Sequence, residues 1–135
     1  MDTKSCYILL ADDDLEDQSL LKDLLLELDP TKKIDSVSDG GAVLDYLHRC
    51  PDADLPCLII LDFKMPVMNA DEVLDALAGD SRYKEIPKIV WSTSNQQNHV
   101  NTCLQRGAKA YFTKPGDFHQ LGSIAGQMLK LSACN

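Results

Sequence analysis

The feature that most restricts the fold is a run of four apolar residues that ends in a carboxylate. Residues 58–61 are all leucine or isoleucine, and Asp62 follows directly. A strand with one solvated face alternates apolar and polar residues, whereas a strand of a parallel sheet is covered on both faces and is continuously apolar. The run therefore predicts a central strand of a parallel sheet. Asp62 would lie at its carboxyl end, where open α/β sheets bind ligands.

The rest of the chain alternates strand and helix patterns around this run. Further strands are expected at Tyr7–Ala11, Ile34–Val37, Ile89–Ser92 and Ala110–Thr113. Helices are expected over Leu15–Leu28, Ala42–Leu47, Glu72–Leu77, Val100–Leu104 and Phe118–Leu129. Asp14 is expected to be the N-cap of the first helix, and Pro30 ends it. A turn is expected at Asp39–Gly41, before the second helix. Five alternations of strand and helix predict a parallel sheet with helices on both faces.

Three local patterns give further expectations about packing. The first helix is expected to place six of its leucines on one face: Leu15, Leu20, Leu21, Leu24, Leu25 and Leu28. Trp91 is expected in the core, on the opposite side of its strand from Ser92. The segment from Cys50 to Pro56 contains two prolines and two aspartates, which predicts an exposed connection.

Size, charge and cysteine content limit the class of protein. A chain of 135 residues predicts one domain over 1–135, with no output domain after the last helix. The net charge of −8 argues against nucleic acid as a partner and disfavours an anionic membrane surface. We find neither a signal peptide nor an apolar run of transmembrane length, so a cytoplasmic location is expected. The five cysteines lack Cys-x-x-Cys spacing and are expected to be reduced thiols.

Polar residues follow four of the five predicted strands. Asp12 and Asp13 end the first strand, Asp62 the third, Ser92 the fourth and Lys114 the fifth. In a parallel sheet these ends meet at one rim, where three carboxylates repel one another without a counter-charge. Oxygen ligands of this kind suit Mg²⁺, which takes one or two carboxylates and completes its coordination with water or phosphate oxygens.

This set of residues indicates phosphoryl transfer onto a carboxylate. Asp62 would be the nucleophile, and a Mg²⁺ at Asp12 and Asp13 would neutralise developing charge. Lys114 would pair with a phosphoryl oxygen, and Ser92 would donate a hydrogen bond to the product. Each residue alone has an ordinary structural explanation, such as a helix start or a turn. Their joint placement at successive strand ends favours the functional interpretation.

At this point the chain resembles the receiver domain of two-component response regulators over nearly its full length. The motifs that carry the resemblance are Ile8-Leu9-Leu10-Ala11-Asp12-Asp13, Leu61-Asp62-Phe63-Lys64-Met65-Pro66, Ile89-Val90-Trp91-Ser92-Thr93, Gly107-Ala108 and Tyr111-Phe112-Thr113-Lys114-Pro115. The resemblance implies a flavodoxin-like (βα)5 three-layer sandwich with strand order 2-1-3-4-5. It also implies a sensor histidine kinase or phosphotransfer protein as the phosphodonor.

The family pattern assigns roles to individual residues. It makes Asp62 the phosphoacceptor and gives Asp12, Asp13 and the Lys64 backbone carbonyl to the Mg²⁺ site. It places Ser92 and Tyr111 at the switch positions and implies a cis Lys114–Pro115 bond. The signal would leave through the face of the fourth helix, fifth strand and fifth helix to a downstream protein that the sequence does not identify. A monomer or weak homodimer that turns over no external substrate is expected, so the chain is predicted not to be an enzyme.

Three departures from the family pattern are visible. Ala70 stands where the family often has glycine, so if that position needs a left-handed backbone, either Ala70 carries strain or the loop differs. Lys64 places a cation two residues after the acceptor, and we predict that it hinders or reorients the attacking water and changes the lifetime of the phosphorylated form. The connection from Cys50 to Pro56 is long for a receiver and resembles stand-alone receivers associated with phytochrome-type kinases.

Other classes of protein fit the sequence less well. Asp12-x-Asp14 resembles the first motif of haloacid dehalogenase-type phosphatases, but Glu16 stands where that motif has Thr or Val. An EF-hand would need glycine at Asp17, and the three aspartates from residue 12 to 14 would repel the phosphate of a flavin. A receiver-fold binding module that works without phosphorylation remains an open alternative.

Overall fold

The computed structural model describes residues 7–132 and contains one five-stranded sheet. The strands are β1 (Tyr7–Ala11), β2 (Lys33–Val37), β3 (Leu58–Asp62), β4 (Lys88–Ser92) and β5 (Ala110–Thr113). Their order is β2-β1-β3-β4-β5, and every neighbouring pair is parallel. The predicted sheet and its strand order are confirmed.

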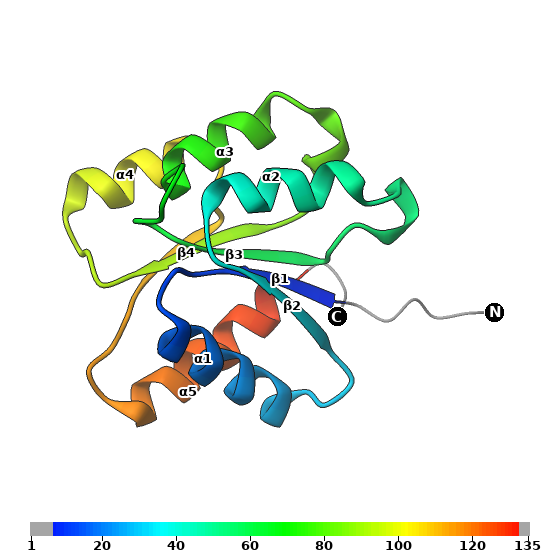
Figure 1. Ribbon diagram of the computed structural model, residues 1–135. Coiled ribbons are helices and arrows are strands. Elements are labelled where there is room, and N and C mark those ends of the chain that lie inside the picture. The colour runs from blue at the N-terminus through cyan, green and yellow to red at the C-terminus, as the bar shows by residue number, and fades with distance from the viewer. Residues whose placement is uncertain (1–6, 133–135) are drawn as a thin grey trace.

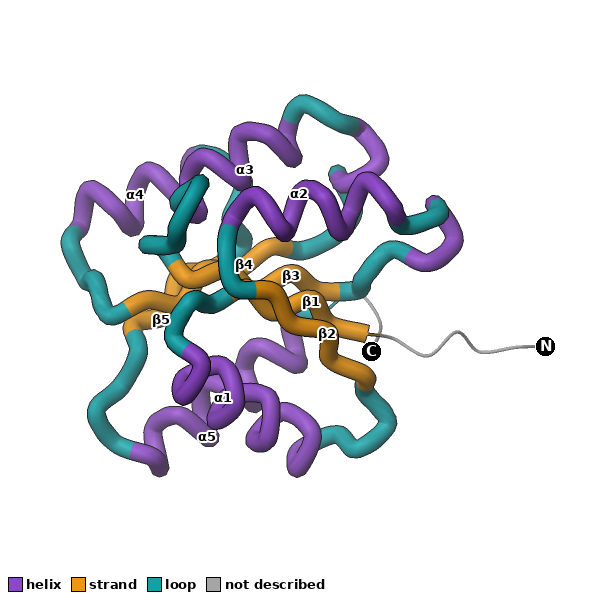
Figure 2. Tube along the Cα trace, in the orientation of Figure 1, coloured by secondary structure: helices purple, strands orange, loops and turns teal. Residues whose placement is uncertain are grey.

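Five helices cover the two faces of the sheet. They are α1 (Leu15–Leu28), α2 (Gly40–Arg49), α3 (Ala70–Ala78), α4 (Gln97–Gln105) and α5 (Phe118–Leu131). Two short 3₁₀ helices, η1 (Asp52–Asp54) and η2 (Ser81–Tyr83), lie in the connections before β3 and β4. Helices α2, α3 and α4 lie on one face, and α1 and α5 lie on the other (Figures 1 and 2). The molecule is therefore a three-layer sandwich.

The central strands are buried on both faces, as their sequence predicts. Every residue of β3 and β4 is buried. Leu9 and Ile59 pack with α2, α3 and α4, whereas Ile60 and Trp91 pack with α1 and α5. Each fully buried side chain of this size contributes roughly 1.5–3 kcal/mol of transfer free energy, so these two cores stabilise a sheet whose rim carries mutually repelling carboxylates. The expected core position of Trp91 is confirmed.

The leucines of α1 do not all share one buried face. Leu21, Leu24 and Leu25 are buried, but Leu15, Leu20 and Leu28 are exposed. Successive residues of a helix are rotated by about 100°, which turns Leu15 away from the stripe formed by Leu21 and Leu25. Asp14 caps the helix as predicted, because its side chain accepts hydrogen bonds from the backbone N–H groups of residues 16 and 17.

The predicted turn at Asp39–Gly41 is wrong, because both glycines are the first residues of α2. Asp39 is the N-cap, and its Oδ1 accepts a hydrogen bond from the Ala42 backbone N–H at 2.7 Å. A Cβ on Gly40 would lie 2.3 Å from the carbonyl oxygen of Met68. Glycine is therefore required here for close packing of α2 against the β3–α3 loop.

The connection from Cys50 to Pro56 is exposed over residues 51–54, as predicted, and Arg82 of η2 holds it in place. The Arg82 Nε donates to Asp52 Oδ1 at 2.6 Å, and an Arg82 terminal nitrogen donates to the carbonyl oxygen of Cys50 at 2.5 Å. Two chain segments some thirty residues apart are thus joined at the amino end of β3. These hydrogen bonds fix the long connection at the amino end of β3, away from the carboxyl ends of the strands.

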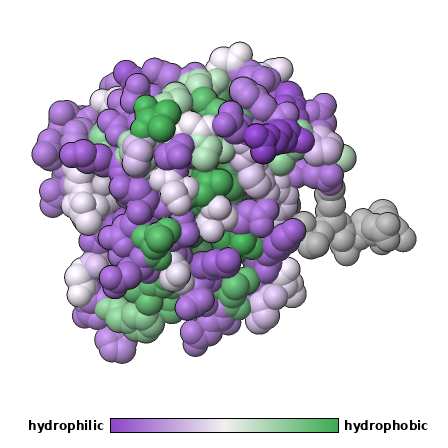
Figure 3. Space-filling model, in the orientation of Figure 1, coloured by the Kyte–Doolittle hydropathy of each residue, from purple (hydrophilic) through white to green (hydrophobic). Residues whose placement is uncertain are grey.

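Three of the five cysteines lie within the described residues, and their thiols are reduced, as predicted. Cys50, Cys57 and Cys103 are free of disulfide bonds, and burial raises the pKa of Cys103 to about 11; Cys6 and Cys134 lie outside the described residues. Figure 3 shows a mainly hydrophilic face with separate hydrophobic spots. No helix within residues 7–132 has the length and apolar character needed to cross a membrane.

Candidate functional site

Three carboxylates converge at the carboxyl rim of the sheet. Carboxylate oxygens of Asp12, Asp13 and Asp62 lie within 4.8 Å of one another. The pairing of β1 with β3 produces this arrangement. Ala11 is opposite Leu61, so the next residues, Asp12 and Asp62, lie side by side at the carboxyl edge of the sheet. Asp12 and Asp62 are buried, whereas Asp13 is exposed. The strand ends therefore bring together the three carboxylates that the sequence placed there.

The donor set at this rim fits a small, hard divalent cation. All three converging side chains offer oxygen, and no thiol or imidazole belongs to the cluster. Mg²⁺ prefers such ligands and keeps water in its remaining positions. The exposed Asp13 gives the cluster access to solvent and to the cleft that Asp13, Asp62 and Lys64 help to line. An ion could enter from this side.

Lys114 supplies the counter-charge within the described part of the site. Its Nζ lies 2.8 Å from Asp12 Oδ2, 2.9 Å from Asp17 Oδ2 and 3.3 Å from Asp62 Oδ2. The Lys114 side chain is 8% exposed, so the ammonium is largely shielded from water. Pairing of a shielded ammonium with several carboxylates offsets the cost of burying them.

Burial and charge shift the ionisation of both central groups. Burial, together with the negative charge of Asp12, raises the pKa of Asp62 to about 7 although Lys114 opposes this shift. Burial alone would lower the pKa of Lys114, but its hydrogen bonds to Asp12 and Asp17 outweigh burial and raise that pKa above its usual value. The site thus holds a permanently charged lysine beside a carboxylate that a proton can still occupy near neutral pH.

Asp17 is the member of this site that sequence reasoning missed. It was considered only as a residue that excludes an EF-hand, yet it is the third residue of α1 and contacts Lys114 directly. Helical side chains tilt toward the N-terminus of their helix, and the N-terminus of α1 lies at the acidic rim. A carboxylate in the first turn after the Asp12–Asp13 pair is the signal that could have identified it.

The predicted switch residues are linked through the loop that follows β4. The Ser92 Oγ accepts a hydrogen bond from the Ser94 backbone N–H at 3.1 Å. The Tyr111 hydroxyl donates to the carbonyl oxygen of Ser94 at 2.7 Å. The ring of His99 in α4 stacks on Phe63, the neighbour of Asp62, with 4.3 Å between ring centroids. Strands β3, β4 and β5 and helix α4 therefore meet at one short loop.

One expectation about the backbone is wrong, and for Ala70 the structure decides between the two alternatives in favour of a different loop. No cis peptide bond occurs within residues 7–132, so the Lys114–Pro115 bond is trans, the isomer that is intrinsically favoured for most X–Pro bonds. Ala70 is not left-handed: it begins α3, and its N–H donates to the Phe63 carbonyl oxygen at 2.8 Å. The left-handed residue is Val67, with φ of 71°.

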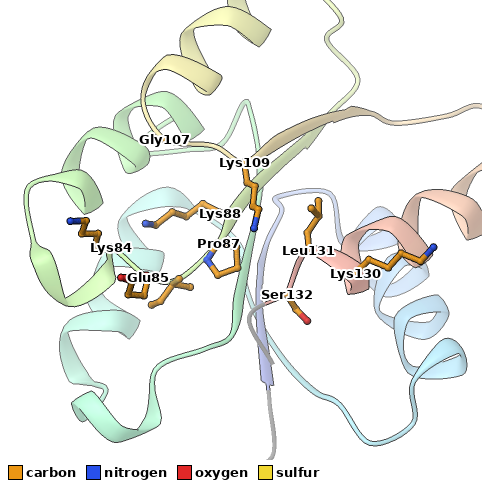
Figure 4. A pocket seen from close by; sticks show the side chains of 10 residues that line it. Lys84, Glu85, Pro87, Lys88, Gly107, Lys109, Lys130, Leu131 and Ser132 are labelled. Atoms are coloured by element: carbon orange, nitrogen blue, oxygen red, sulfur yellow. The ribbon is translucent and has the colours of Figure 1, made fainter. Parts of the chain in front are cut away.

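A second hollow lies at the opposite, amino end of β4. It is lined by Lys84, Lys88 and Lys109, with Lys130 on its α5 side. Figure 4 shows that the ammonium of Lys130 points away from this hollow. Of the residues that line it, only Glu85 carries a carboxylate. The hollow has no cluster of carboxylates and no carboxylate paired with a buried lysine, whereas the carboxyl rim has both. The rim is therefore the candidate site.

A parallel doubly wound sheet with an acidic cluster and a facing lysine at its carboxyl rim defines the class of two-component receiver domains. The model of the response regulator receiver domain matches residues 8–125, and the chain belongs to this family. It is a signalling module of two-component systems. The predicted family and flavodoxin-like fold are thereby confirmed.

Several characterised proteins are similar to this chain. Two-component response regulator ORR5 of Oryza sativa subsp. japonica is 27% identical over 92% of this chain and 89% of its own length. The probable methanogenesis regulatory protein FilR2 of Methanothrix harundinacea is 30% identical over 84% of this chain and 75% of its own length. Both similarities cover most of the chain, so they concern the receiver as a whole.

Solved structures show the same architecture. The phosphorylated cyanobacterial phytochrome response regulator RcpA is 27% identical, with a TM-score of 0.86 over 94% of this chain and 93% of that chain. The response regulator RPA3017 in red light signalling of R. palustris is 26% identical, with a TM-score of 0.78 over 90% of each chain. The resemblance to receivers of phytochrome systems is therefore also a structural one.

Proposed function

We propose that this chain is a phosphoacceptor that receives a phosphoryl group on Asp62 from a sensor histidine kinase or phosphotransfer protein. The observation that supports this most directly is the position of the Asp62 carboxylate. It lies beside Asp12 and Asp13 and 3.3 Å from the Lys114 ammonium, on the wall of an open cleft. Nucleophile, cation ligands and counter-charge are thus present together, which is what phosphoryl transfer needs.

Each residue has a defined part in the transfer. An Asp62 carboxylate oxygen forms a bond to phosphorus while the bond between phosphorus and the donor's imidazole nitrogen breaks. Asp12, Asp13 and Asp62, with the Lys64 backbone carbonyl, would hold a Mg²⁺ that neutralises charge on the phosphoryl oxygens. Lys114 pairs with one of these oxygens, and Ser92 donates a hydrogen bond to another.

The proposed output is a change of the surface formed by α4, β5 and α5. Ser92 would turn its hydroxyl toward the phosphoryl group, which releases the N–H of Ser94 from the bond it now makes to Ser92 Oγ. The bond between Tyr111 and the Ser94 carbonyl would then be lost, and Tyr111 would turn inward. A local charge change would in this way bias a two-state element.

The proposed partners are proteins. A histidine kinase or phosphotransfer protein would dock at the cleft, and an unidentified downstream protein would read the α4–β5–α5 surface. The acidic net charge of −8 favours neither nucleic acid nor an anionic membrane as a partner. We propose a single receiver domain over residues 1–135 that acts in the cytoplasm as a monomer or weak homodimer. It modifies only its own side chain and so is not an enzyme in the ordinary sense.

Incubation with acetyl phosphate and Mg²⁺, followed by intact mass measurement, tests this function. The wild type should gain the mass of one phosphoryl group, and Asp62→Asn should gain none. Asp23→Asn, which removes an exposed carboxylate outside the cleft, should be modified like the wild type. An unmodified wild type would contradict the proposal and favour a binding module that works without phosphorylation, whereas equal yield in Asp62→Asn would show that another residue is the acceptor.

A further inference from the structure

Lys114 has a third carboxylate partner that comes from a helix and not from a strand end. Asp17 Oδ2 lies 2.9 Å from Lys114 Nζ, as close as the 2.8 Å contact with Asp12 and closer than the 3.3 Å contact with Asp62. Asp17 also lines the same cleft as Asp62 and Lys114. The ammonium of Lys114 is therefore shared between carboxylates at the strand ends and a carboxylate in the first turn of α1.

The three contacts use all the hydrogen-bonding capacity of the ammonium. A lysine ammonium has three N–H donors, and three carboxylate oxygens surround it. A phosphoryl oxygen on Asp62 can pair with Lys114 only if it takes a donor from one of these partners. The two short pairs, to Asp12 and Asp17, must then loosen for the ammonium to move outward into the cleft.

The ion pairs of Lys114 with Asp12 and with Asp17 differ in the groups that compete for the carboxylate. Asp12 is fully buried, and its Oδ1 is fixed by the Asp14 backbone N–H at 2.9 Å. As a ligand of the proposed metal it would also give part of its charge to the ion. Asp17 has no such competing partner: its side chain is 34% exposed and its described contact is with Lys114. In a metal-loaded site, Asp17 is the carboxylate that still holds the lysine.

We propose that Asp17 is a positioning residue that retains the Lys114 ammonium in the unphosphorylated protein and competes for it with the incoming phosphoryl group. This role rests on the function proposed above, because it concerns the same reaction. Asp17 slows phosphorylation and makes the first turn of α1 sensitive to the state of Asp62. It acts through Lys114 and does not touch the reacting atoms.

Trp91 offers a direct measure of where the ammonium lies. Lys114 Nζ sits 4.6 Å from the centroid of the Trp91 ring, and Trp91 is the only tryptophan of the chain. A cation over an indole face interacts with its π system. Movement of Lys114 should therefore change the emission of Trp91 even when neither metal nor phosphodonor is present.

The test compares Asp17→Ala with Glu16→Ala. Both remove one carboxylate from the first turn of α1, but the exposed Glu16 side chain does not contact Lys114. In metal-free protein, Asp17→Ala should change the Trp91 emission spectrum, whereas Glu16→Ala should match the wild type. With saturating Mg²⁺ and acetyl phosphate, Asp17→Ala should be phosphorylated roughly 1.5- to fivefold faster, the range expected for loss of a partly exposed ion pair. Asp17→Glu, which keeps the carboxylate, should restore both properties toward wild type.

The outcomes separate this inference from the function on which it rests. Failure of the wild type to be phosphorylated would contradict the proposed function, and the Trp91 spectra would still report whether Asp17 positions Lys114. If the wild type is phosphorylated but Asp17→Ala behaves like Glu16→Ala in both measurements, Asp17 has no special role. Slower phosphorylation of Asp17→Ala than of the wild type would also contradict the proposal that Asp17 competes with the phosphoryl group for Lys114. A thermal unfolding curve for each variant establishes that the compared proteins are folded.

Discussion

The acceptor carboxylate lies where a strand buried on both faces meets a charged rim. Burial and the neighbouring Asp12 raise the pKa of Asp62 to about 7 in the metal-free site. A proton therefore competes with a metal ion for this carboxylate at neutral pH, because only the deprotonated group is a ligand. In the proposed transfer the same proton would also block Asp62 as a nucleophile, so metal binding would favour its activation.

This competition gives the metal affinity a defined pH dependence. As the pH falls through about 7, protonation of Asp62 should weaken Mg²⁺ binding. With a pKa near 7, affinity should be roughly tenfold lower at pH 6 than at pH 8. Titration of Mg²⁺ into the protein, followed by Trp91 fluorescence, measures it. Asp62→Asn should bind more weakly and lose most of this pH dependence; an equal affinity of the wild type at both pH values would contradict the account.

Lys64 should control how long the phosphoryl group lasts. Its side chain is exposed and lines the cleft two residues after Asp62, where it can hinder the attacking water or turn it away from the phosphorus. Phosphorylated Lys64→Ala should therefore lose its phosphoryl group severalfold faster than the wild type. Lys84→Ala, which removes an exposed lysine at the opposite end of β4, is the control. Equal rates for Lys64→Ala and the wild type would show that Lys64 plays no part.

Residues at strand ends could be predicted from the sequence, whereas residues placed by helices and loops could not. Asp12, Asp62 and Lys114 follow apolar runs, and the parallel topology alone brings them together. Asp17 reaches the site only because α1 packs with its first turn at the rim, which no strand pattern encodes. In the β3–α3 loop the left-handed residue is Val67 and not Ala70, because the loop turns before α3 begins.

Among the elements, the β3–α3 loop carries the backbone strain. Val67 has φ of 71° and is exposed, and a branched side chain is unfavourable in this conformation by about 1–2 kcal/mol. Val67→Gly should therefore raise the free energy of unfolding by up to about 1 kcal/mol after the entropy of the unfolded glycine is deducted. Urea denaturation measures this change. Val100→Gly, in the ordinary helical backbone of α4, should instead lower stability, and a loss of stability in Val67→Gly would argue against strain.

The start of α2 packs against the same loop and tolerates no side chain. Gly40→Ala should destabilise the protein by roughly 1–3 kcal/mol, because the added Cβ would lie 2.3 Å from the Met68 carbonyl oxygen. Gly122→Ala in α5 meets no atom within 4 Å and should stabilise by about 0.5–1 kcal/mol, the usual gain for this change inside a helix. Thermal unfolding of both variants provides the comparison. Two variants of equal stability would refute this packing account.

Helix positions followed from periodicity more reliably than their buried faces did. The cap at Asp14 and the break at Pro30 fixed α1, yet three of its seven leucines are exposed because the helix packs through a narrow stripe. For α2, the two glycines indicated a turn, but glycine was needed there by a contact with residues almost thirty positions away. Such contacts depend on tertiary structure, which local pattern does not contain.

In the whole molecule, the loop after β4 connects the acceptor to the proposed output surface. Ser94 lies in this loop and forms hydrogen bonds with Ser92, His99 and Tyr111. Addition of beryllofluoride, a phosphoryl mimic, with Mg²⁺ should therefore change amide hydrogen exchange at the β4–α4 loop and β5. Exchange in α2, which α3 separates from α4 on the same face of the sheet (Figure 1), should be unaffected. A change confined to α2, or no change at β5, would contradict the proposed route.

The central claim is that Asp62 itself carries the phosphoryl group. Borohydride reduces an aspartyl phosphate to homoserine, which marks the modified residue permanently. After treatment with acetyl phosphate, Mg²⁺ and borohydride, peptide sequencing by mass spectrometry should find homoserine at position 62 and aspartate at positions 12, 13 and 17. Homoserine at one of these other positions, or unchanged aspartate at 62 in protein that had gained phosphoryl mass, would contradict the account.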